Sequence, residues 1–195
     1  MHMDWLKWEQ AMQWEVTSLE EKQVFEQVAV LPEGRRAIPL MWVYDFKHGP
    51  QGEIVSEKAR VVILGNRQGV LDVGETYSAV AKSTSIRLVL SYVAAHHWFF
   101  NTFDVKTAFL NADLKEEVYC HQVPHFPESH QDTILRLRKA LYGLRQAGNA
   151  WYNTLQPVLE KFGLTRCEID HGVFFGSWSS SPHPSVPMPE DGSPL

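Results

Sequence analysis

The chain of 195 residues is long enough for one domain with a proper core, and its 44% hydrophobic and 21% charged residues are typical of globular proteins. Its net charge of −5 does not indicate nucleic-acid binding by the molecule as a whole, and its two cysteines are too few for a disulfide framework. The sequence has no signal-peptide pattern and no apolar run of about 18 residues, so we expect an intracellular, cytoplasmic protein that is not secreted and has no membrane partner.

The first predicted elements are a helix and a hairpin. Residues 4–20 are predicted to be helical, with Asp4 as cap and with apolar side chains at helical spacing: Trp5, Trp8, Met12 and Leu19. Residues 40–47 alternate the aromatic side chains of one strand face, namely Trp42, Tyr44 and Phe46, and "HGPQGE" follows as a turn. Residues 54–64 then form the second arm, so these segments predict a small mixed lobe.

A second helix is predicted to begin at Ser83, with a capping hydroxyl in "KSTS". Its apolar side chains share one face: Ile86, Val89, Leu90, Val93 and Ala94. His96 and His97 lie at its end, where positive charge is favourable. The β-prone run "WFFNTF" then predicts a buried strand that ends at Asp104, and "KTAFLNADL" predicts a short turn-helix.

The remaining elements are short strands around a third helix. Strands are predicted over residues 117–123 and 133–137, and "GVFFGSW" is typical of a last strand. A helix between them and this last strand has Asn149 as cap and Gly163 as stop, although Pro157 inside it should cost about 3 kcal/mol if unrelieved. Residues 179–195 are rich in proline and serine without an apolar period, so we expect a disordered tail.

Asp104 is the first candidate site residue. An unpaired charge at the end of a buried strand would be costly, so such a carboxylate is usually a cap or a ligand. Metal chemistry on phosphates often uses two carboxylates. A partner would be expected in an adjacent acidic pair, but none of the three pairs is convincingly placed: Glu20–Glu21, Glu116–Glu117 and Glu190–Asp191.

Basic and aromatic residues alternate in the segment between Asp132 and Glu160, which contains no acidic residue. Such a surface suits phosphates and stacked bases, and its members are Arg136, Arg138, Lys139, Arg145, Tyr142, Trp151 and Tyr152. A smaller basic patch on the hairpin comprises Lys58, Arg60 and Arg67. A solvated basic face is the alternative interpretation of both patterns. A zinc site at Cys120, His121 and His125 is a weak hypothesis, since a second ligand pair is absent.

Several stretches together resemble one family. They are "WEQAMQWE", "MWVYDFK", "GEIVSEKARVVILGNRQ", "FDVKTAFLNADLKEEVY", "LRKALYGLRQAGNAWY" and "GLTRCEIDHGVFF". Over about residues 5–175 the chain resembles the reverse transcriptase, an RNA-directed DNA polymerase, of copia-type LTR retrotransposons. The resemblance implies an α/β fold over residues 1–178: a partial right-hand polymerase unit of fingers and palm, with an antiparallel sheet and helices packed on one side.

The resemblance also implies roles for individual residues. Asp104 matches the first catalytic, metal-binding aspartate, and the main-chain carbonyl of Val105 would join it on Mg²⁺. Phe109 matches the aromatic residue under the incoming sugar. Further matches face the triphosphate or lie along the path of the nucleotide and template: Lys58, Arg60, Tyr142, Gly143, Arg145 and Gln146. The implied partners are an RNA or DNA template-primer and deoxynucleotides.

The chain departs from the family pattern at several places. Leu64 replaces a second arginine of the fingers motif, Gly148 replaces a proline, and "DVGETYSAV" replaces "DYxETFSPV". After "DHGVFF" the family has a Tyr-Xaa-Asp-Asp hairpin with two more catalytic carboxylates, and "GSWSSSPHPSV" stands here instead. We therefore expect a truncated reverse transcriptase that is inactive alone. The alternatives are a non-catalytic nucleic-acid-binding remnant and an inert structural fragment.

Overall fold

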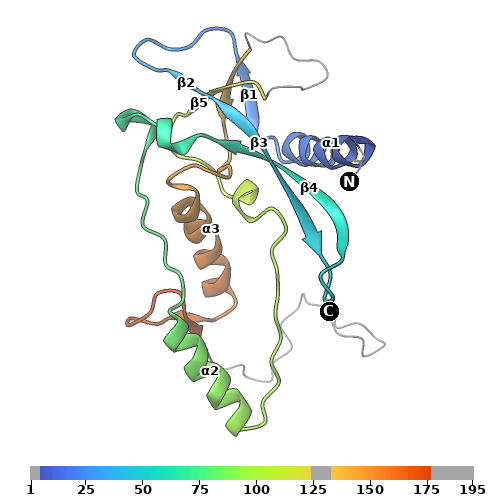
Figure 1. Ribbon diagram of the computed structural model, residues 1–195. Coiled ribbons are helices and arrows are strands. Elements are labelled where there is room, and N and C mark those ends of the chain that lie inside the picture. Colours follow the sequence, from blue (N-terminus) through green and yellow to red (C-terminus); the bar gives the residue numbers. More distant parts are fainter. Residues whose placement is uncertain (1–4, 124–132, 177–195) are drawn as a thin grey trace.

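The structure is a computed structural model that describes residues 5–123 and 133–176. It combines helices with mainly antiparallel strands, which confirms the predicted α/β class (Figure 1). The expected cap Asp4, the candidate ligand His125 and the tail over residues 179–195 lie outside the described residues.

The central sheet has four short strands in the order β1-β6-β5-β2. Their bounds are β1, Phe25–Val28; β2, Ala37–Ile38; β5, Tyr119–His121; and β6, Ile134–Leu137. β1 and β5 pair with β6 in the antiparallel sense, whereas β2 pairs with β5 in the parallel sense. The expected antiparallel sheet therefore contains one parallel pair, and the strands predicted over residues 117–123 and 133–137 are confirmed as β5 and β6.

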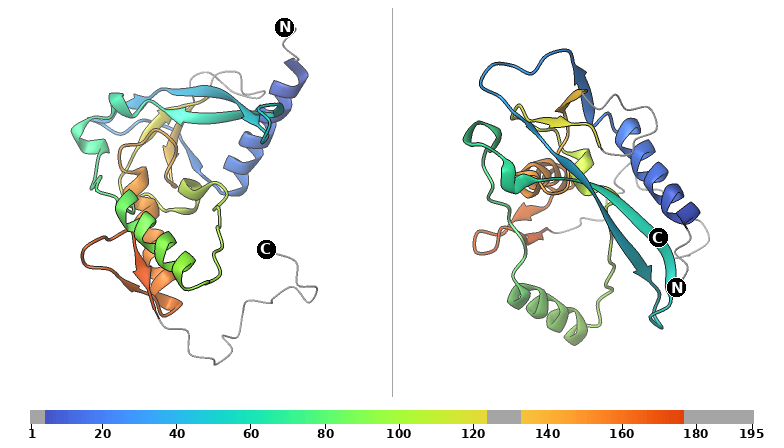
Figure 2. Two further views of the ribbon diagram at one scale, coloured as in Figure 1. Left: turned by 60° about the horizontal axis from the view of Figure 1, so that its bottom comes forward. Right: turned by 45° about the horizontal axis from the view of Figure 1, so that its top comes forward.

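The predicted hairpin is confirmed as two long strands, β3 (Leu40–His48) and β4 (Ile54–Ile63), joined by the expected turn. Helix α1 (Trp5–Glu21) lies against it (Figure 2). The helix buries Trp8, Met12, Val16 and Leu19, and the Trp8 ring meets the rings of Tyr44 and Phe46 edge-on at 5.2 and 5.1 Å. Trp5, expected on the same stripe, is 60% exposed because it lies in the first turn, beyond the contact.

Helix α3 (Ala147–Lys161) runs through Pro157 and ends before Gly163, which has the positive φ of +80° expected of a stop. It begins two residues before the predicted cap Asn149, whose side-chain amide instead donates to the carbonyl of Tyr77. The described residues also contain the 3₁₀ turns η1 (Gly65–Arg67), η2 (Val70–Asp72) and η3 (Ala108–Asn111), the last being the predicted turn-helix. Strand β8 (Phe174–Phe175) lies within the predicted last strand, whose final two residues are outside the described part, and it pairs with β7 (Thr165–Arg166) in a small hairpin.

One core joins the sheet, the hairpin, α1, η3 and the start of α3. Its fully buried aliphatic side chains are Leu19, Val24, Ile38, Val61, Ile63, Leu110, Val118, Leu137 and Leu141. Burial of such a side chain contributes about 1.5–3 kcal/mol relative to exposure. This core fixes the positions of β4, η3 and the segment before α3, the three places that matter below.

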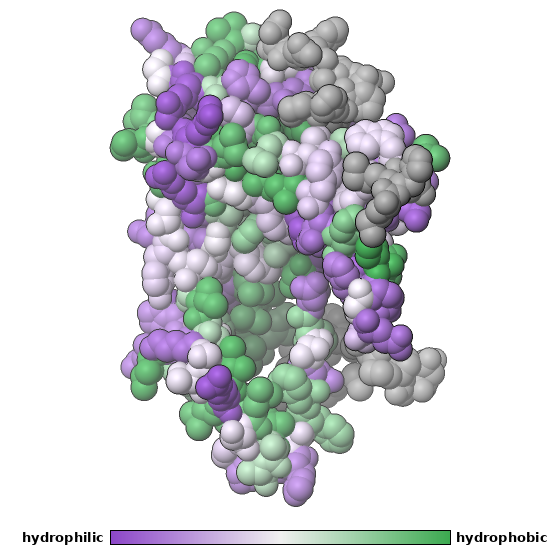
Figure 3. Space-filling view, viewed as in Figure 1, coloured by the Kyte–Doolittle hydropathy of each residue, from purple (hydrophilic) through white to green (hydrophobic). Residues whose placement is uncertain are grey.

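Helix α2 (Ser83–Ala95) forms where it was predicted but buries none of its residues, so its apolar face is not packed on the sheet. Figure 3 shows hydrophobic side chains at the surface in the lower part of the molecule, where α2 lies. The expected hydroxyl cap is also wrong: the cap residue is Lys82, and its backbone N–H donates to the carboxylate of Asp170 at 2.9 Å.

The strand predicted to end at Asp104 does not form. Residues 98–105 are neither helical nor β, and Phe99 and Phe103 are 99% and 78% exposed. A strand is stable only when a neighbour pairs with its N–H and C=O groups, and no strand in the described part of the chain runs beside this segment. Asp104, which follows this segment, is exposed.

Candidate nucleotide site

Three residues that the sequence pattern singled out come together in space. The guanidinium carbon of Arg60 lies 5.9 Å from the centroid of the Tyr142 ring, within range of a cation–π contact. The Phe109 ring also meets the Tyr142 ring edge-on, with ring centroids 5.0 Å apart and ring planes at 66°. We call Arg60, Tyr142 and Phe109 the aromatic–guanidinium cluster. It joins β4, η3 and the segment before α3.

The alternation of β4 places Arg60 in this cluster. Ala59 and Val61 point into the core, so Lys58 and Arg60 point to the opposite face of the strand. Lys58 is exposed and Arg60 half-buried, so both positive charges remain available to a ligand in solvent. Lys58 and Arg60 of the predicted basic patch therefore lie on the same face of β4.

Backbone contacts hold Tyr142 beside β4. The Ile63 N–H donates to the Tyr142 carbonyl at 2.9 Å, which extends the pairing of β4 by one bond. The next residue, Gly143, has φ +93°, and a Cβ there would overlap the Ile63 carbonyl oxygen. A Cβ on Gly65 would likewise overlap the Gly143 carbonyl oxygen. The two chains cross at a pair of glycines because no side chain fits between them.

Phe109 is positioned by the turn η3. The turn begins after Thr107, which adopts a left-handed φ of +50°, and the Ala112 N–H donates to the Phe109 carbonyl at 3.0 Å. The neighbouring side chain of Leu110 is fully buried in the core. Phe109 is therefore held at the edge of the core with its ring towards Tyr142.

The electrostatics of Tyr142 connect the cluster to Asp104. Burial raises the pKa of the Tyr142 hydroxyl above its ordinary value, and the charge of Arg60 opposes this shift. The carboxylates of Glu15 and Asp104 raise the pKa of Tyr142 further, so both lie within electrostatic range of its hydroxyl.

The described residues do not by themselves fit the Mg²⁺ implied by the resemblance. Asp104 and Val105 are exposed, and no group of three or more His, Cys, Asp or Glu residues in the described part could hold a metal ion. Mg²⁺ requires near-octahedral oxygen ligands, of which one carboxylate and one carbonyl supply too few. Asp113, another carboxylate nearby in sequence, is paired with the Lys139 ammonium at 2.6 Å.

The basic residues around α3 do not form one patch. Arg136 pairs with Glu117 at 3.5 Å and Lys139 pairs with Asp113, whereas Arg138 and Arg145 are exposed. The zinc hypothesis also lacks support among the described residues. Burial raises the pKa of the Cys120 thiol to about 12, and His121, the next residue along the strand, is exposed on the opposite face.

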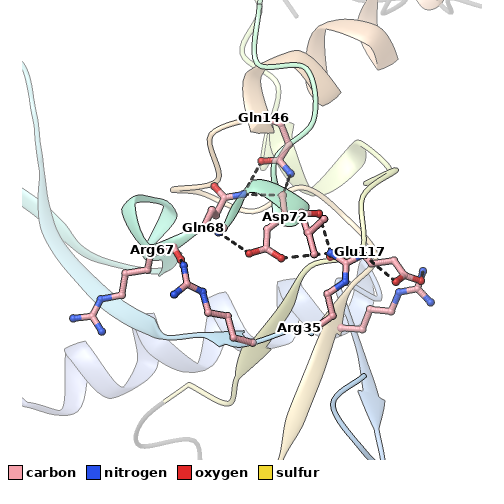
Figure 4. A network of polar contacts seen from close by, with 10 residues as sticks. Arg35, Arg67, Gln68, Asp72, Glu117 and Gln146 are labelled. Carbon is pink, nitrogen blue, oxygen red and sulfur yellow. Dashed lines mark hydrogen bonds and ion pairs between the residues drawn. The ribbon is translucent and has the colours of Figure 1, made fainter. Parts of the chain in front are cut away.

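A buried polar network links the last two predicted site residues to the rest of the molecule (Figure 4). The Gln146 side chain is 2% exposed, and its amide bonds to the Gln68 amide and to the Asp72 carbonyl. Gln146 therefore faces the protein interior. The backbone N–H of Arg145 donates to the Gln68 side chain. The Arg145 residue itself is exposed to solvent.

No sequence pattern singled out Gln68, Asp72 or Arg35 of this network, and Glu117 was considered only within an acidic pair that could help to bind a metal. Arg35 reaches both the Asp72 carboxylate, at 3.6 Å, and the Glu117 carboxylate, at 3.4 Å. The one available signal was Gln68 itself, a polar residue in a short segment bounded by Gly65 and Gly69. None of these residues belongs to a periodic pattern.

Comparison with known proteins shows the family of the chain. A family profile described as reverse transcriptase (RNA-dependent DNA polymerase) matches residues 22–181. The chain is 36% identical over 170 residues to the retrovirus-related Pol polyprotein from transposon RE2 of Arabidopsis thaliana, covering 86% of this chain and 12% of that protein. It is 35% identical over 173 residues to the corresponding polyprotein from transposon TNT 1-94 of Nicotiana tabacum, covering 88% and 13%.

A more distant relative is the transposon Ty1-NL2 Gag-Pol polyprotein of Saccharomyces cerevisiae, 29% identical over 141 residues, which cover 70% of this chain and 7% of that protein. No solved structure matches the chain. The chain spans about one eighth of the length of the plant polyproteins. No helix in the described residues is long and apolar enough to cross a membrane. The chain belongs to the reverse transcriptase (RNA-dependent DNA polymerase) family, and it is similar to the part of copia-type retrotransposon Pol polyproteins that it matches.

Proposed function

We propose that these residues form the nucleotide-facing wall of an RNA-directed DNA polymerase. The observation that carries the proposal is the aromatic–guanidinium cluster, in which three separate segments meet beside the exposed ammonium of Lys58. A charged group, two aromatic faces and a close backbone crossing suit a ligand that combines phosphates with a sugar and a base.

Each residue of the wall has a chemical role in this proposal. Lys58 and Arg60 donate to the triphosphate of the incoming deoxynucleotide, and Phe109 lies under its sugar. Tyr142 and Gly143 shape the floor beside the nucleotide, and Arg145 contacts the template-primer from the outside of the same segment. The reaction joins the primer 3′-oxygen to the α-phosphorus and breaks the bond to the bridging oxygen, which leaves with pyrophosphate.

The family generally uses divalent metal ions, and Asp104 with the Val105 carbonyl is the candidate place for one. The carboxylate of Asp104 does not complete a metal site by itself, and the described residues contain no group of three or more side chains that could hold the ion. We therefore expect these residues to bind nucleotide weakly without turnover. RNA-directed polymerisation would require carboxylates beyond those described.

Triphosphate affinity tests the proposal. Calorimetry with a deoxynucleoside triphosphate should give a measurable Kd for the wild type, and Arg60→Ala should weaken it roughly tenfold or more, since a hydrogen bond to a charged group contributes about 1.5–3 kcal/mol. Arg87→Ala, on the exposed surface of α2, is the matched loss of one positive charge and should leave the Kd unchanged. Equal weakening by both variants would refute a role for the cluster.

A second candidate is nucleic-acid binding without chemistry. It is favoured by the single carboxylate of the described site and by the exposed guanidinium groups of Arg138 and Arg145. Binding of a primer-template should then weaken steeply between low and physiological salt, because phosphate contacts release counterions. If neither nucleotide nor primer-template raises the melting temperature, the chain is an inert structural fragment, since a ligand of the native state must stabilise it.

A further inference from the structure

Two buried glutamine side chains satisfy each other and two backbone groups. Gln68 is 6% exposed, and its amide nitrogen donates to the Gln146 side-chain oxygen at 2.9 Å and to the Asp72 carbonyl at 3.0 Å. The Gln68 oxygen accepts from the Arg145 N–H at 2.9 Å. The Gln146 nitrogen donates to the same Asp72 carbonyl at 2.8 Å. We call this arrangement the amide lock.

The amide lock fastens together two segments that are 74 or more residues apart. One segment is η1 and η2, which continue directly from β4, and the other is the turn between Tyr142 and α3. The glycine crossing of Gly65 and Gly143 lies on one side of this turn, and the lock holds the other side at Arg145. Four residues of backbone, from Tyr142 to Arg145, are thus held at both ends.

The lock is itself anchored to the sheet. Asp72 is 3% exposed. Its carboxylate accepts a hydrogen bond from the Gly69 N–H at 2.7 Å and forms an ion pair with Arg35. Arg35 in turn donates to the Glu117 carbonyl and carboxylate, just before β5 (Figure 4). A chain of buried or half-buried polar contacts therefore runs from the sheet to the turn that carries Tyr142.

We propose that Gln68 and Gln146 are positioning residues, which hold the Tyr142 ring against Arg60 and Phe109 without touching the nucleotide. The inference deepens the proposed function, on which its nucleotide-binding consequence rests. Both amides have all their described partners inside the protein, so Gln146 acts on the ligand through Tyr142. An unpaired buried amide is expensive, so the lock opens or closes as a unit.

The direct readout is the Tyr142 ring. In NMR spectra of protein labelled with ¹³C-tyrosine, the Tyr142 ring signals are assigned by their loss in Tyr142→Phe. Their chemical shifts depend on the position of the adjacent Phe109 ring. Gln68→Met keeps the side-chain length but removes the three hydrogen bonds of Gln68. We expect it to move the Tyr142 signals, and to weaken triphosphate binding about tenfold, the value of one or two buried hydrogen bonds.

Asn149→Ala is the matched control. The Asn149 amide also fastens the segment after β4 to α3, since it donates to the Tyr77 carbonyl and not to a residue of the lock. It should leave the Tyr142 signals and the Kd unchanged. Unchanged Tyr142 signals in a folded Gln68→Met protein would overturn the inference. If the wild type binds no triphosphate, the proposed nucleotide function fails, and the ring signals still decide the positioning role.

Hydrogen exchange of the wild type gives a test that needs no variant. The Arg145 N–H is bound by the Gln68 side chain, and the Ile63 N–H by the Tyr142 carbonyl. If the lock and the crossing hold one rigid turn, these two amides should exchange with similar protection. Exchange of the Arg145 amide about a hundredfold faster than that of Ile63 would show that the lock opens separately, and would refute the inference.

Discussion

Substitution of Gly143 tests whether the crossing beside Tyr142 is as tight as the structure indicates. An alanine at φ +93° is strained by about 1–2 kcal/mol in the left-handed region. Its Cβ would also overlap the Ile63 carbonyl oxygen and lie 2.7 Å from the Val62 Cγ1 atom. The carbonyl belongs to the backbone, so relief requires a shift that disrupts the bond from Ile63 to Tyr142, at about 1 kcal/mol more.

We therefore expect Gly143→Ala to lower the free energy of unfolding by about 2–3 kcal/mol in urea denaturation. Gly34→Ala is the control, because Gly34 has a φ of +76° but a Cβ there meets nothing within 4 Å. It should show the backbone strain alone, about 1–2 kcal/mol. Equal losses in the two variants would mean that the two chains separate easily at the crossing, and the rigid placement of Tyr142 would be refuted.

Three further predictions concern single side chains. Hydrogen bonds from Ser85 and the Lys82 N–H lower the pKa of Asp170 from its ordinary 3.8. The stability that Asp170 contributes is therefore present at neutral pH and lost as the pH falls below 3.8, and Asp170→Ala should speed hydrogen exchange in the first turn of α2 at pH 7. Burial raises the pKa of Glu15 from 4.5, so its contribution is largest below pH 4.5 and is lost as the pH rises. Glu15→Gln should consequently stabilise the protein at pH 7 in thermal melts, whereas a loss of stability there would contradict the assigned cause. The thiol of Cys120, with its pKa raised to about 12, should resist iodoacetamide in the native state, while the half-buried Cys167 reacts first in mass spectrometry of the labelled peptides.

Elements whose patterns are local could be predicted from the sequence. The aromatic alternation of residues 40–47 and the turn after it predicted the β3–β4 hairpin, because side-chain period and turn chemistry act over a few residues. Helical spacing predicted α1, α2 and α3 for the same reason. The stretches "FDVKTAFLNADLKEEVY" and "LRKALYGLRQAGNAWY" in particular indicated the reverse transcriptase family, which the profile match over residues 22–181 shows.

Which of these patterns are buried, and which residues they contact, depends on the tertiary structure. The run before Asp104 is β-prone, yet it forms no strand since ladder hydrogen bonds need a neighbour that local sequence does not specify. The apolar face of α2 remains exposed, and the backbone N–H of its cap residue Lys82 donates to Asp170, which lies 88 residues away in the sequence. Gln68 and Gln146 meet only when β4 and the turn before α3 cross, because a hydrogen bond between distant segments leaves no period in the sequence.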